Sequence, residues 1–578
     1  MFLEKYVKDN NVYVKLSENT KYIKDGKTKY KKRTVLSLGN EKKLPVSFQE
    51  LRESYKNGVA LIPELEKFLP GEVKISLNIN DSTQYIEKNV GYLLLNRIFD
   101  QLGISNVITL EKSRKNIKYD ILGLTKLLVF ERFLNPCSKY RTFTKKDMFL
   151  GDVTKSSDYR EIYAALDVLD NKAPQIMNIM NRNIERTITR DKSLIFYDVT
   201  NYYFETDRND EDGIRKAGVS KENRKQPVVQ MGLFLDRNSI PIAYDLHPGN
   251  TLDSLTLKPS MQKYIDRYDL ENILIVADRG LCSGGNEIYI KEQGNDYLFA
   301  RSVRKASKEM KEWILNQENY VTNESGSFKY KYRLLKRTAT ADGGKTRKEI
   351  EEKVLVYWSK SFYERELKEK ERFIETLRKY SENPNSIPSR KAKGLEKYIK
   401  REQVDKKTGK ILKTREQRSI DLEKIEKEDE LMGYYLLSTS KTEMKPSDMI
   451  NTYKGLSKIE NCFRITKSEL EARPVFVRKK EHINAHFLIC FISLVMMRII
   501  QYKLFQKEEK EFRVWSEGLS ARKVQESLKE FKVAVLDDKC IFREVSENLQ
   551  LLLDRLEIPF DFKVCKVHEI SRKLKFSL

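Results

Sequence analysis

One carboxylate in this sequence stands where its residue type is uncommon. Asp198 lies in the segment SLIFYDVTNYYFE, whose other residues are mostly strand formers, and aspartate is depleted in strands. A buried and unpaired charge costs several kcal/mol. Asp198 therefore needs a cation, a metal ion or a hydrogen-bond network beside it, or a place at the open end of its strand.

The segment from 191 to 300 predicts an α/β unit that brings a second carboxylate to Asp198. Strands are expected at 193–199 and over PVVQMGLFLD and SIPIAYDL, then a helix near 252–267, the strand ENILIVAD, the helix GGNEIYIKEQ and the strand NDYLFA. This β-β-β-α-β-α-β order is that of a ribonuclease H-like core, a mixed five-stranded sheet with helices, in which the first and fourth strands are neighbours. Asp278, which ends ENILIVAD, would lie beside Asp198. Two adjacent carboxylates repel each other, and divalent metal ions bound to them would offset this repulsion.

A third carboxylate, Glu460, is expected on a helix. The stretch KPSDMINTYKGLSKIENCFRITKSEL has a proline suited to a first helical turn and an apolar stripe at helical spacing. Tyr453, Glu460 and Lys467 recur every seven residues, so they fall near one face, with Lys467 about 10 Å from Glu460 along the axis. Arg464 joins this face. A carboxylate flanked by cations is also the pattern of an ordinary salt-bridge ladder.

In these motifs the sequence resembles the DDE transposases of bacterial insertion sequences, in the group with the signature Y-x2-R-x3-E-x6-K. Tyr453, Glu460 and Lys467 match that signature by type and spacing. YDVTNYYFE and VADRGLCSGGN are similar to the two aspartate motifs of the family. The resemblance implies catalytic and metal-binding roles for Asp198, Asp278 and Glu460.

The sequence departs from the signature at one position, because Leu456 stands where the family has an arginine. The phosphate or DNA-end contact that the family makes there is missing, or is moved to Lys458 or Arg464. The resemblance covers the chain from about 190 to 500 and includes a β-rich insertion before the glutamate helix. The expected DNA contacts in this region are Tyr453, Arg464, Lys467 and, outside the signature, Arg301.

The chemistry that the resemblance implies is phosphoryl transfer on DNA with two metal ions. Ions about 4 Å apart hold the attacking and leaving oxygens from opposite sides, and oxygen-only ligands favour Mg²⁺, with Mn²⁺ as substitute. Asp198 would bridge the ions and Asp278 and Glu460 would take one each, so the three carboxylates should converge in one cluster. The freed 3′-OH would then attack target DNA. The expected partners are the terminal inverted repeats and the target DNA, both double-stranded, bound by a homodimer on paired ends.

The length of 578 residues is too great for one core and predicts several domains. A turn signal, Asp25-Gly26, between strand-like runs predicts a hairpin in the first of them. The expected divisions are a small basic β module (1–75), a helical region for DNA-end binding (76–190), the first part of the ribonuclease H-like core (191–304), the β-rich insertion with a charged helix (305–440), the glutamate helix and a following buried helix (441–505), and a C-terminal helical region for dimerisation (506–578).

The charge balance points to a polyanionic partner. There are 109 Lys and Arg against 85 Asp and Glu, a formal net charge of +24. Two stretches concentrate the basic residues: seven against one acid at 21–33, and twelve against four at 390–418. A solvated charged face is the alternative interpretation of both. In the first stretch the expected DNA contacts are Lys29, Lys31, Lys32 and Arg33.

Cysteine usage and hydropathy predict a cytoplasmic protein. The six cysteines are scattered without a CxxC pair, which is typical of reduced thiols. The N-terminus lacks the apolar core of a signal peptide, and the longest apolar run, Phe487 to Met497, is shorter than the ~20 residues that span a bilayer. That run predicts a buried helix. The expected location is the bacterial cytoplasm, with association to the nucleoid when DNA is bound.

Several residues offer competing interpretations. Asp236 or Asp245 could replace Asp278 beside Asp198, although the strand that Asp278 ends is the expected neighbour.

Two other functions stay open as well. A metal-dependent, ribonuclease H-like nuclease would keep the three carboxylates and lack strand transfer. An inactive DNA-binding relic or regulator would not need all three carboxylates.

The histidines and tyrosines near these motifs invite other chemistry. His482 and His486 have the i, i+4 spacing of a zinc pair, but the glutamate of HExxH is absent, so packing is the favoured interpretation. His247 lies in an expected loop and is interpreted as a turn residue rather than a phosphate contact. Tyr202 and Tyr203 could form a covalent phosphotyrosine, yet no Arg/His cluster of that chemistry surrounds them.

Overall fold

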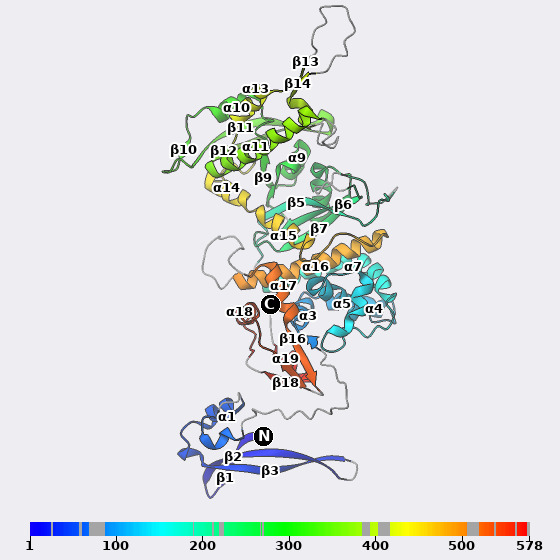
Figure 1. The fold of residues 1–578 in the computed structure, drawn as a ribbon, viewed down its shortest axis with the longest axis vertical. Helices are drawn as coiled ribbons and strands as arrows, with labels where there is room; N and C mark the ends of the chain where they lie inside the picture. Colours follow the sequence, from blue (N-terminus) through cyan, green and yellow to red (C-terminus); the bar gives the residue numbers. More distant parts are fainter. Residues whose placement is uncertain are drawn as a thin grey trace, which may run out of the picture. The chain divides into compact units, whose positions relative to one another are not determined.

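The structure, a computed structural model, is described for most of the chain. The described residues are 1–24, 27–56, 60–68, 87–188, 190–210, 213–218, 225–265, 267–268, 271–383, 394–402, 417–505, 519–536, 539–560 and 563–574. The chain forms two compact units, each of which is considered by itself (Figure 1). The first comprises Met1–Asn89, Lys532–Val545 and Glu557–Lys575, and the second comprises Val90–Phe531, Ser546–Leu556 and Phe576–Leu578.

The first unit holds a three-stranded antiparallel sheet at its N-terminal end. Its strands are β1 (Phe2–Lys8), β2 (Asn11–Lys24) and β3 (Lys27–Asn40), followed by η1 (Glu41–Lys43), α1 (Phe48–Lys56) and α2 (Pro63–Glu66). Alternation along β1 and β2 places Leu3, Val14 and Leu16 in a core with Leu51 of α1. β2 pairs with β3 as far as Lys24 opposite Lys27. Asp25 and Gly26, the predicted turn, lie outside the described residues.

A second sheet in this unit joins segments far apart in the sequence. Its order is β18-β17-β16-β4, with β4 (Glu87–Asn89), β16 (Lys532–Leu536), β17 (Lys539–Phe542) and β18 (Val564–Lys566), and α19 (Val567–Lys573) follows. The C-terminal region, expected to be helical over 506–578, therefore contains strands as well as helices. The short runs KVAVL and KCIF are rich in β-branched and apolar residues, which favours strands over helices.

The second unit begins with a series of helices. The described part of the expected helical region (76–190) starts with the strand β4, and its first helix begins at Tyr92 and buries Leu94 and Ile98. Pairing of β4 with β16 overrides the helical period there. The helices of this region are α3 (Tyr92–Gln101), α4 (Ile104–Arg114), α5 (Ile121–Leu134), α6 (Lys139–Thr144), η2 (Lys146–Met148) and α7 (Glu161–Thr187).

A long apolar helix, α16 (Lys480–Phe505), runs through the second unit. It packs against α5, α7 and the sheet strand β7 (Pro241–Pro248). By length and composition α16 could cross a bilayer, yet 94% of its most apolar window is buried inside the protein, as in the core helix of a globular domain. The predicted buried helix at Phe487 to Met497 is thus confirmed.

The central sheet of the second unit confirms a mixed α/β fold. Nine strands follow the order β10-β11-β12-β15-β9-β8-β5-β6-β7 (Figure 1). The five core strands are β5 (Leu194–Tyr203), β6 (Val228–Leu235), β7, β8 (Leu274–Ala277) and β9 (Asp296–Arg301). β5 and β8 are parallel neighbours, with Tyr197 opposite Ala277. The predicted adjacency of the first and fourth strands is therefore observed.

The segment after the core strands extends the same sheet instead of forming a separate layer. β15 pairs with β9, and β12, β11 and β10 follow outward. The strands Ile399–Glu402 and Gln417–Ile420 pair antiparallel in a separate two-stranded sheet. The elements are α10 (Lys308–Leu315), β10 (Val321–Thr322), β11 (Phe328–Ala341), η5 (Asp342–Gly344), β12 (Thr346–Ser359), α11 (Lys360–Glu382), η7 (Glu396–Tyr398), β13 (Ile399–Glu402), β14 (Gln417–Ile420), α13 (Leu422–Asp429) and β15 (Tyr434–Thr439).

The predicted glutamate helix is divided into two. α14 (Pro446–Lys454) and α15 (Ser457–Lys467) are separated at Gly455. A Cβ on Gly455 would lie 2.5 Å from a ring atom of Phe196, so glycine allows the chain to pass close to β5. The remaining short elements are η3 (Asp253–Leu255), α8 (Leu257–Tyr264), η4 (Arg279–Leu281), α9 (Gly284–Glu292), α17 (Ala521–Glu530) and α18 (Glu547–Arg555).

Candidate active site

The three predicted carboxylates line one cavity of about 350 Å³, called here the carboxylate cavity. Asp198 comes from β5, Asp278 follows β8, and Glu460 lies on α15. Three elements far apart in the sequence thus contribute one acid each. The other lining residues are Thr200, Asp253, Gly280, Leu281, Phe463, Arg464 and Lys467.

The register of the sheet explains why Asp198 tolerates its place in a strand. β8 ends at Ala277, opposite Tyr197, so Asp198 is the next residue of β5 after that pair and lies at the edge where β8 stops. The side chain is half-buried, and the backbone N–H of Val199 donates to its Oδ1 at 2.7 Å. Of the environments expected for Asp198, a hydrogen bond is present, whereas the end of its strand is not, because β5 continues to Tyr203.

Asp278 is exposed and is held by a tyrosine. The hydroxyl of Tyr453, the last buried residue of α14, donates to Asp278 Oδ1 at 2.9 Å. Burial, and next the charge of Asp278, raise the pKa of Tyr453, so this hydroxyl stays a donor. Tyr453 was expected to contact DNA, and that contact stays a prediction. The hydrogen bond gives Tyr453 a second role, as a positioning residue for Asp278.

Glu460 is exposed and does not form the salt-bridge ladder that its helix would allow. Arg464 pairs with Glu469 at 3.0 Å, and Lys467 donates to Thr200 Oγ1 at 2.8 Å. Within the described residues Glu460 has no ion-pair partner. Its carboxylate therefore faces the cavity with two cations nearby that are bound to other groups.

The donor set of the carboxylate cavity suits a hard divalent cation. All its acidic ligands are carboxylates, and no histidine or cysteine lines it. In the part of the chain that the structure describes, no group of three His, Cys, Asp or Glu side chains lies close enough together to hold one ion. The expectation that the three carboxylates converge in one tight cluster is not met. The open arrangement fits Mg²⁺, which keeps several water ligands and takes one or two carboxylates.

A fourth carboxylate, Asp253, lines the same cavity and was not anticipated from the sequence. It begins η3, after the third core strand, in the segment HPGNTLDSL. Its Oδ1 accepts a long hydrogen bond, 3.4 Å, from Nε2 of Gln230 on β6. The only sequence signal is an acid in a loop that follows a predicted strand, which is too common to mark a site.

The competing aspartates lie elsewhere. Asp236 is fully buried and forms an ion pair with Arg190 at 3.1 Å, and burial raises its pKa to about 6. Asp245 accepts from Lys263 at 2.6 Å. Neither lines the carboxylate cavity. Asp278 is therefore the carboxylate that the fold places with Asp198.

The histidines and the tyrosine pair have packing partners. His482 Nε2 lies 3.0 Å from an Asp167 oxygen, and His486 Nε2 lies 3.0 Å from the Ala472 carbonyl. His247 lies in strand β7 rather than in a loop, so its interpretation as a turn residue is wrong, and its Nε2 lies 3.0 Å from the Ser260 hydroxyl in a buried setting. The Tyr202 hydroxyl is fully buried and lies 2.6 Å from Thr466 Oγ1. These contacts support packing over zinc binding and over a phosphotyrosine mechanism.

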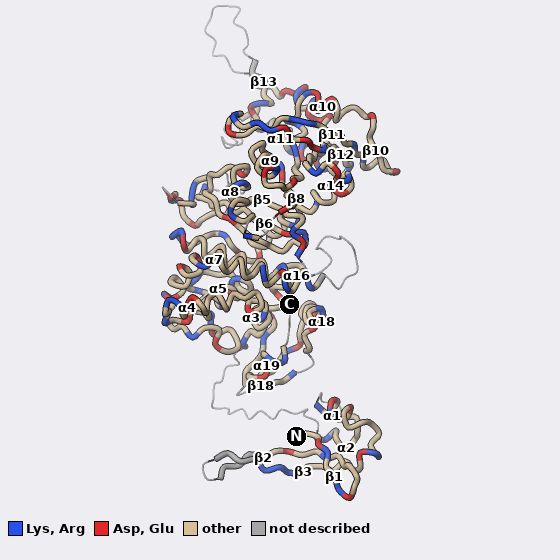
Figure 2. The backbone as a smooth tube through the Cα atoms, turned by 180° about the vertical axis from the view of Figure 1, so that it is seen from behind, with Lys and Arg blue, Asp and Glu red and all other residues tan. Residues whose placement is uncertain are grey.

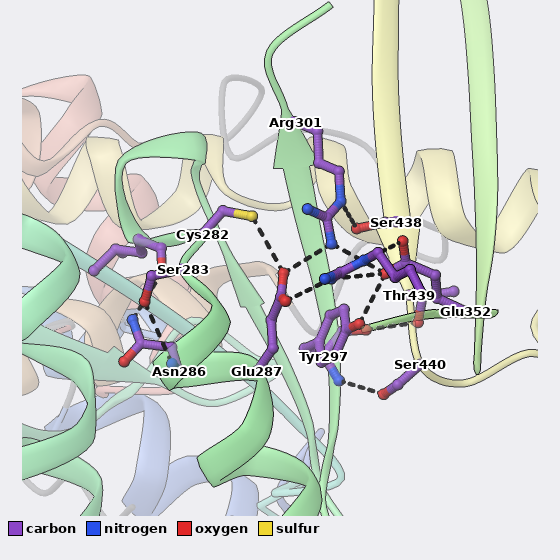
Figure 3. A network of polar contacts seen from close by, with 12 residues as sticks. Cys282, Ser283, Asn286, Glu287, Tyr297, Arg301, Glu352, Ser438, Thr439 and Ser440 are labelled. Atoms are coloured by element: carbon purple, nitrogen blue, oxygen red, sulfur yellow. Dashed lines mark hydrogen bonds and ion pairs between the residues drawn. The ribbon is translucent and has the colours of Figure 1, made fainter. Parts of the chain in front are cut away.

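Arg301 belongs to a network in which two half-buried arginines contact two buried glutamates, at the junction of the core and the added strands (Figure 3). Its guanidinium contacts Glu287 of α9 at 2.8 Å and Glu352 of β12 at 3.0 Å. Arg337 of β11 pairs with the same two glutamates, and the Tyr297 hydroxyl donates to Glu352 at 2.9 Å. Arg301 thus links α9, β9 and β12, and its expected DNA contact stays a prediction.

The basic residues of the first stretch lie on β2 and β3 of the first unit. Figure 2 shows Lys and Arg positions in blue along β3. Lys31, Lys32 and Arg33 are exposed, and Lys32 pairs with Glu4. The side chain of Lys29 and most of the stretch 390–418 lie outside the described residues. The DNA contacts expected for these lysines and arginines stay predictions.

The sheet order and the carboxylates at its β5–β8 edge are those expected of a ribonuclease H-like enzyme of the DDE class. Residues 189–496, more than half of the chain, match the family model described as transposase DDE domain. The chain therefore belongs to the transposase DDE domain family. The match includes all three predicted carboxylates.

Comparisons with individual proteins are more distant. No curated protein matches the sequence. Among solved structures, the piggyBac transposase synaptic complex with hairpin DNA is 10% identical with a TM-score of 0.36, and the alignment covers 82% of this chain and 85% of that one. A pre-cleavage Mos1 transpososome is 9% identical with a TM-score of 0.14, covering 30% and 58%. The Mos1 paired-end complex with left transposon end is 9% identical with a TM-score of 0.14, covering 43% and 70%.

Proposed function

We propose that the protein is an insertion-sequence transposase, which cleaves DNA at the ends of its element and joins the 3′-OH to target DNA by Mg²⁺-dependent phosphoryl transfer. The observation that carries the proposal is the carboxylate cavity, in which acids from three separate elements meet beside Arg464 and Lys467. Membership of the transposase DDE domain family supports DNA transposition as the process.

The protein's own groups divide the work of binding a phosphodiester. Asp198, Asp278 and Glu460 would hold the metal ions, which supply a nucleophile and stabilise charge on the leaving oxygen. Lys467 and Arg464 are placed to attract the phosphates of the bound strand. Tyr453 fixes Asp278 through its hydroxyl.

The arginine missing from the signature is best replaced by Arg464. Leu456 is buried and cannot contact a phosphate. The Nζ of Lys458 donates to the carbonyl of Arg237 at 3.2 Å and is turned away from the carboxylate cavity, which it does not line. Arg464 is exposed and lines that cavity. We assign the phosphate contact to Arg464.

The remaining parts of the proposal follow from charge and chemistry. A net charge of +24 supports binding to terminal inverted repeats and to target DNA. Action on both ends of an element requires two active sites, so we propose a homodimer on paired ends. All six cysteines are free, in keeping with the bacterial cytoplasm as the location.

The test uses the DNA that brackets the gene. A labelled duplex carrying the terminal repeat of the encoding element is incubated with full-length protein in Mg²⁺ or Mn²⁺, and nicking and joining to a target plasmid are measured. Asp198→Asn and Glu460→Gln should lower cleavage by orders of magnitude while gel-shift affinity survives. The matched control is Asp245→Asn, which removes a carboxylate of the same sheet outside the cavity. This variant should cut DNA normally.

Each contrary outcome has a distinct meaning. Cleavage without joining would leave the metal-dependent nuclease as the function. Binding without any cleavage in either metal would identify a DNA-binding relic or regulator. If Asp198→Asn cuts as well as the wild type, the carboxylate is structural and the proposal fails.

A further inference from the structure

Two cysteines of the first unit face each other across a sheet. Cys540 of β17 is opposite Cys565 of β18 in the antiparallel register, so their side chains project from the same face. Cysteines elsewhere in the chain have other polar neighbours. The thiol of Cys137 lies 3.3 Å from Thr142 Oγ1, and that of Cys282 donates to a glutamate. Cys540 and Cys565 are therefore placed to react with each other.

The backbone spacing of the pair suits a disulfide bond. The N–H of Phe542 donates to the carbonyl of Lys563 at 2.9 Å, which makes these two residues a hydrogen-bonded pair of the ladder. Such pairs recur at every second residue, so Cys540 and Cys565 form another, with Cα atoms about 5.5 Å apart. Disulfide bonds usually join Cα atoms separated by about 4.4–6.8 Å. The two thiols can therefore be joined without a change of register.

The environments of the two thiols give them different reactivity. A hydrogen bond between them lowers the pKa of Cys565 and raises that of Cys540. The thiolate is the reactive form of cysteine. Cys540 is fully buried, whereas Cys565 is 6% exposed. Cys565 is thus both the more acidic and the more exposed thiol, so it should react first with an oxidant.

The strand that carries Cys565 is the one that can open most easily. Among the described strands, β18 stands at the end of the order β18-β17-β16-β4, and its register with β17 covers three residue pairs. A short strand at the end of a sheet separates locally at a lower free energy than the core of a domain. An oxidant can therefore reach Cys565 by local opening of β18.

We infer that Cys540 and Cys565 form a reversible disulfide bond under oxidising conditions and that this bond holds β18 on β17. With hydrogen peroxide as the oxidant, the Cys565 thiolate attacks one oxygen, the O–O bond breaks, and a sulfenic acid and one water form. The Cys540 thiol then attacks this sulfur, and a second water leaves as the S–S bond forms. Two thiols are oxidised and one peroxide is reduced to two waters. Exchange with a small thiol in excess reverses the bond.

The experiment oxidises folded, full-length protein with hydrogen peroxide, alkylates the remaining thiols and digests the protein with trypsin without reduction. Lysine or arginine flanks each cysteine, so the digest isolates them in the peptides CIFR (540–543) and VCK (564–566). We expect mass spectrometry to find these two peptides linked, and the link to disappear on reduction. Hydrogen exchange of the β18 amides should slow by about tenfold or more in the oxidised protein.

Two single variants test the order of the steps. Cys540→Ser should form no link and should accumulate the sulfenic acid of Cys565, which dimedone captures. Cys565→Ser should form neither the link nor a sulfenic acid at Cys540, because that thiol is fully buried. The matched control is Cys137→Ser, which removes a half-buried thiol of the second unit and should leave the link unchanged.

Three results would overturn the inference, and each is obtained with the wild type, so none depends on the folding of a variant. The first is the absence of the linked peptide at peroxide doses that modify Cys137. The second is a set of links that joins other cysteines in equal yield, which would indicate reaction of unfolded chains. The third is a link that leaves hydrogen exchange of β18 unchanged.

Discussion

The hydrogen bond from Tyr453 to Asp278 allows a quantitative prediction about catalysis. Tyr453→Phe removes one oxygen atom from a buried ring and leaves the apolar packing of α14 in place. Asp278 is exposed and loses a fixed donor, so its carboxylate becomes free to rotate. The change tests whether orientation of this one carboxylate matters to cleavage.

The magnitude follows from the chemistry of the bond. A hydrogen bond to a charged acceptor contributes about 1.5–3 kcal/mol, and each 1.4 kcal/mol is about tenfold in rate. The 2.9 Å distance is that of a well-formed bond. We therefore expect single-turnover cleavage to fall by about 10- to 100-fold at low Mg²⁺. Part of the loss should be recovered at high Mg²⁺, because mass action compensates for a weakened site.

The assay is cleavage of the terminal-repeat duplex as a function of Mg²⁺ concentration, with DNA affinity measured by gel shift. Tyr435→Phe is the matched control, since its ring lies 6.2 Å from that of Tyr453 and its hydroxyl is not bonded to Asp278. Because burial and the charge of Asp278 raise the pKa of Tyr453, the effect should be constant between pH 6 and pH 9.

The reasoning would be refuted by a specific pattern. If Tyr453→Phe cuts bound DNA at the wild-type rate but binds DNA more weakly, the hydroxyl contacts DNA, as the signature implies, and does not position Asp278. A loss that grows with pH would instead assign Tyr453 a proton-transfer role.

Three further predictions concern stability and binding. Glu352→Gln removes a buried carboxylate from two half-buried guanidinium groups and should lower the free energy of unfolding, measured by urea denaturation, by about 3 kcal/mol. Glu309→Gln, in an exposed ion pair, should change it by less than about 1 kcal/mol. Burial lowers the pKa of Lys139 to about 7, so the folded state binds fewer protons than the unfolded state between pH 7 and the ordinary lysine pKa. The free energy of unfolding of the wild type should therefore rise with pH over that interval, and this rise should be absent from Lys139→Met. Equal pH profiles of the two proteins would contradict the prediction. Neutralising Lys31 and Lys32 should reduce the slope of log affinity against log salt by about 2, and an unchanged slope would make β3 a solvated face.

The sequence predicted the sheet best where strand and helix signals agreed. The apolar part of ENILIVAD, Leu274–Ala277, is buried as β8, and together with the order of the core strands it placed Asp278 beside Asp198. The seven-residue spacing around Glu460 was less informative. It implied one continuous helix, but Gly455 passes within van der Waals range of Phe196, a contact between residues far apart in the sequence that spacing cannot reveal.

Residues that depend on side-chain partners were the least predictable. The sequence shows that Arg464 and Lys467 are cations near Glu460, but not that they bind Glu469 and Thr200 instead. The same limit applies to Arg301, whose two glutamate partners the sequence does not reveal. A charged residue finds its partner through packing of the whole fold, so its role follows only after the fold is known.

Asp253 and Gln230 extend this argument to the site itself. Neither belongs to a motif, yet the fold places Asp253 in the wall of the carboxylate cavity and buries Gln230 behind it, where its Nε2 donates to Asp253. Among the described residues, Gln230 Oε1 has no hydrogen-bond partner. Such a position is defined by what the neighbouring side chains leave unfilled, so no sequence pattern can show it before the fold is known.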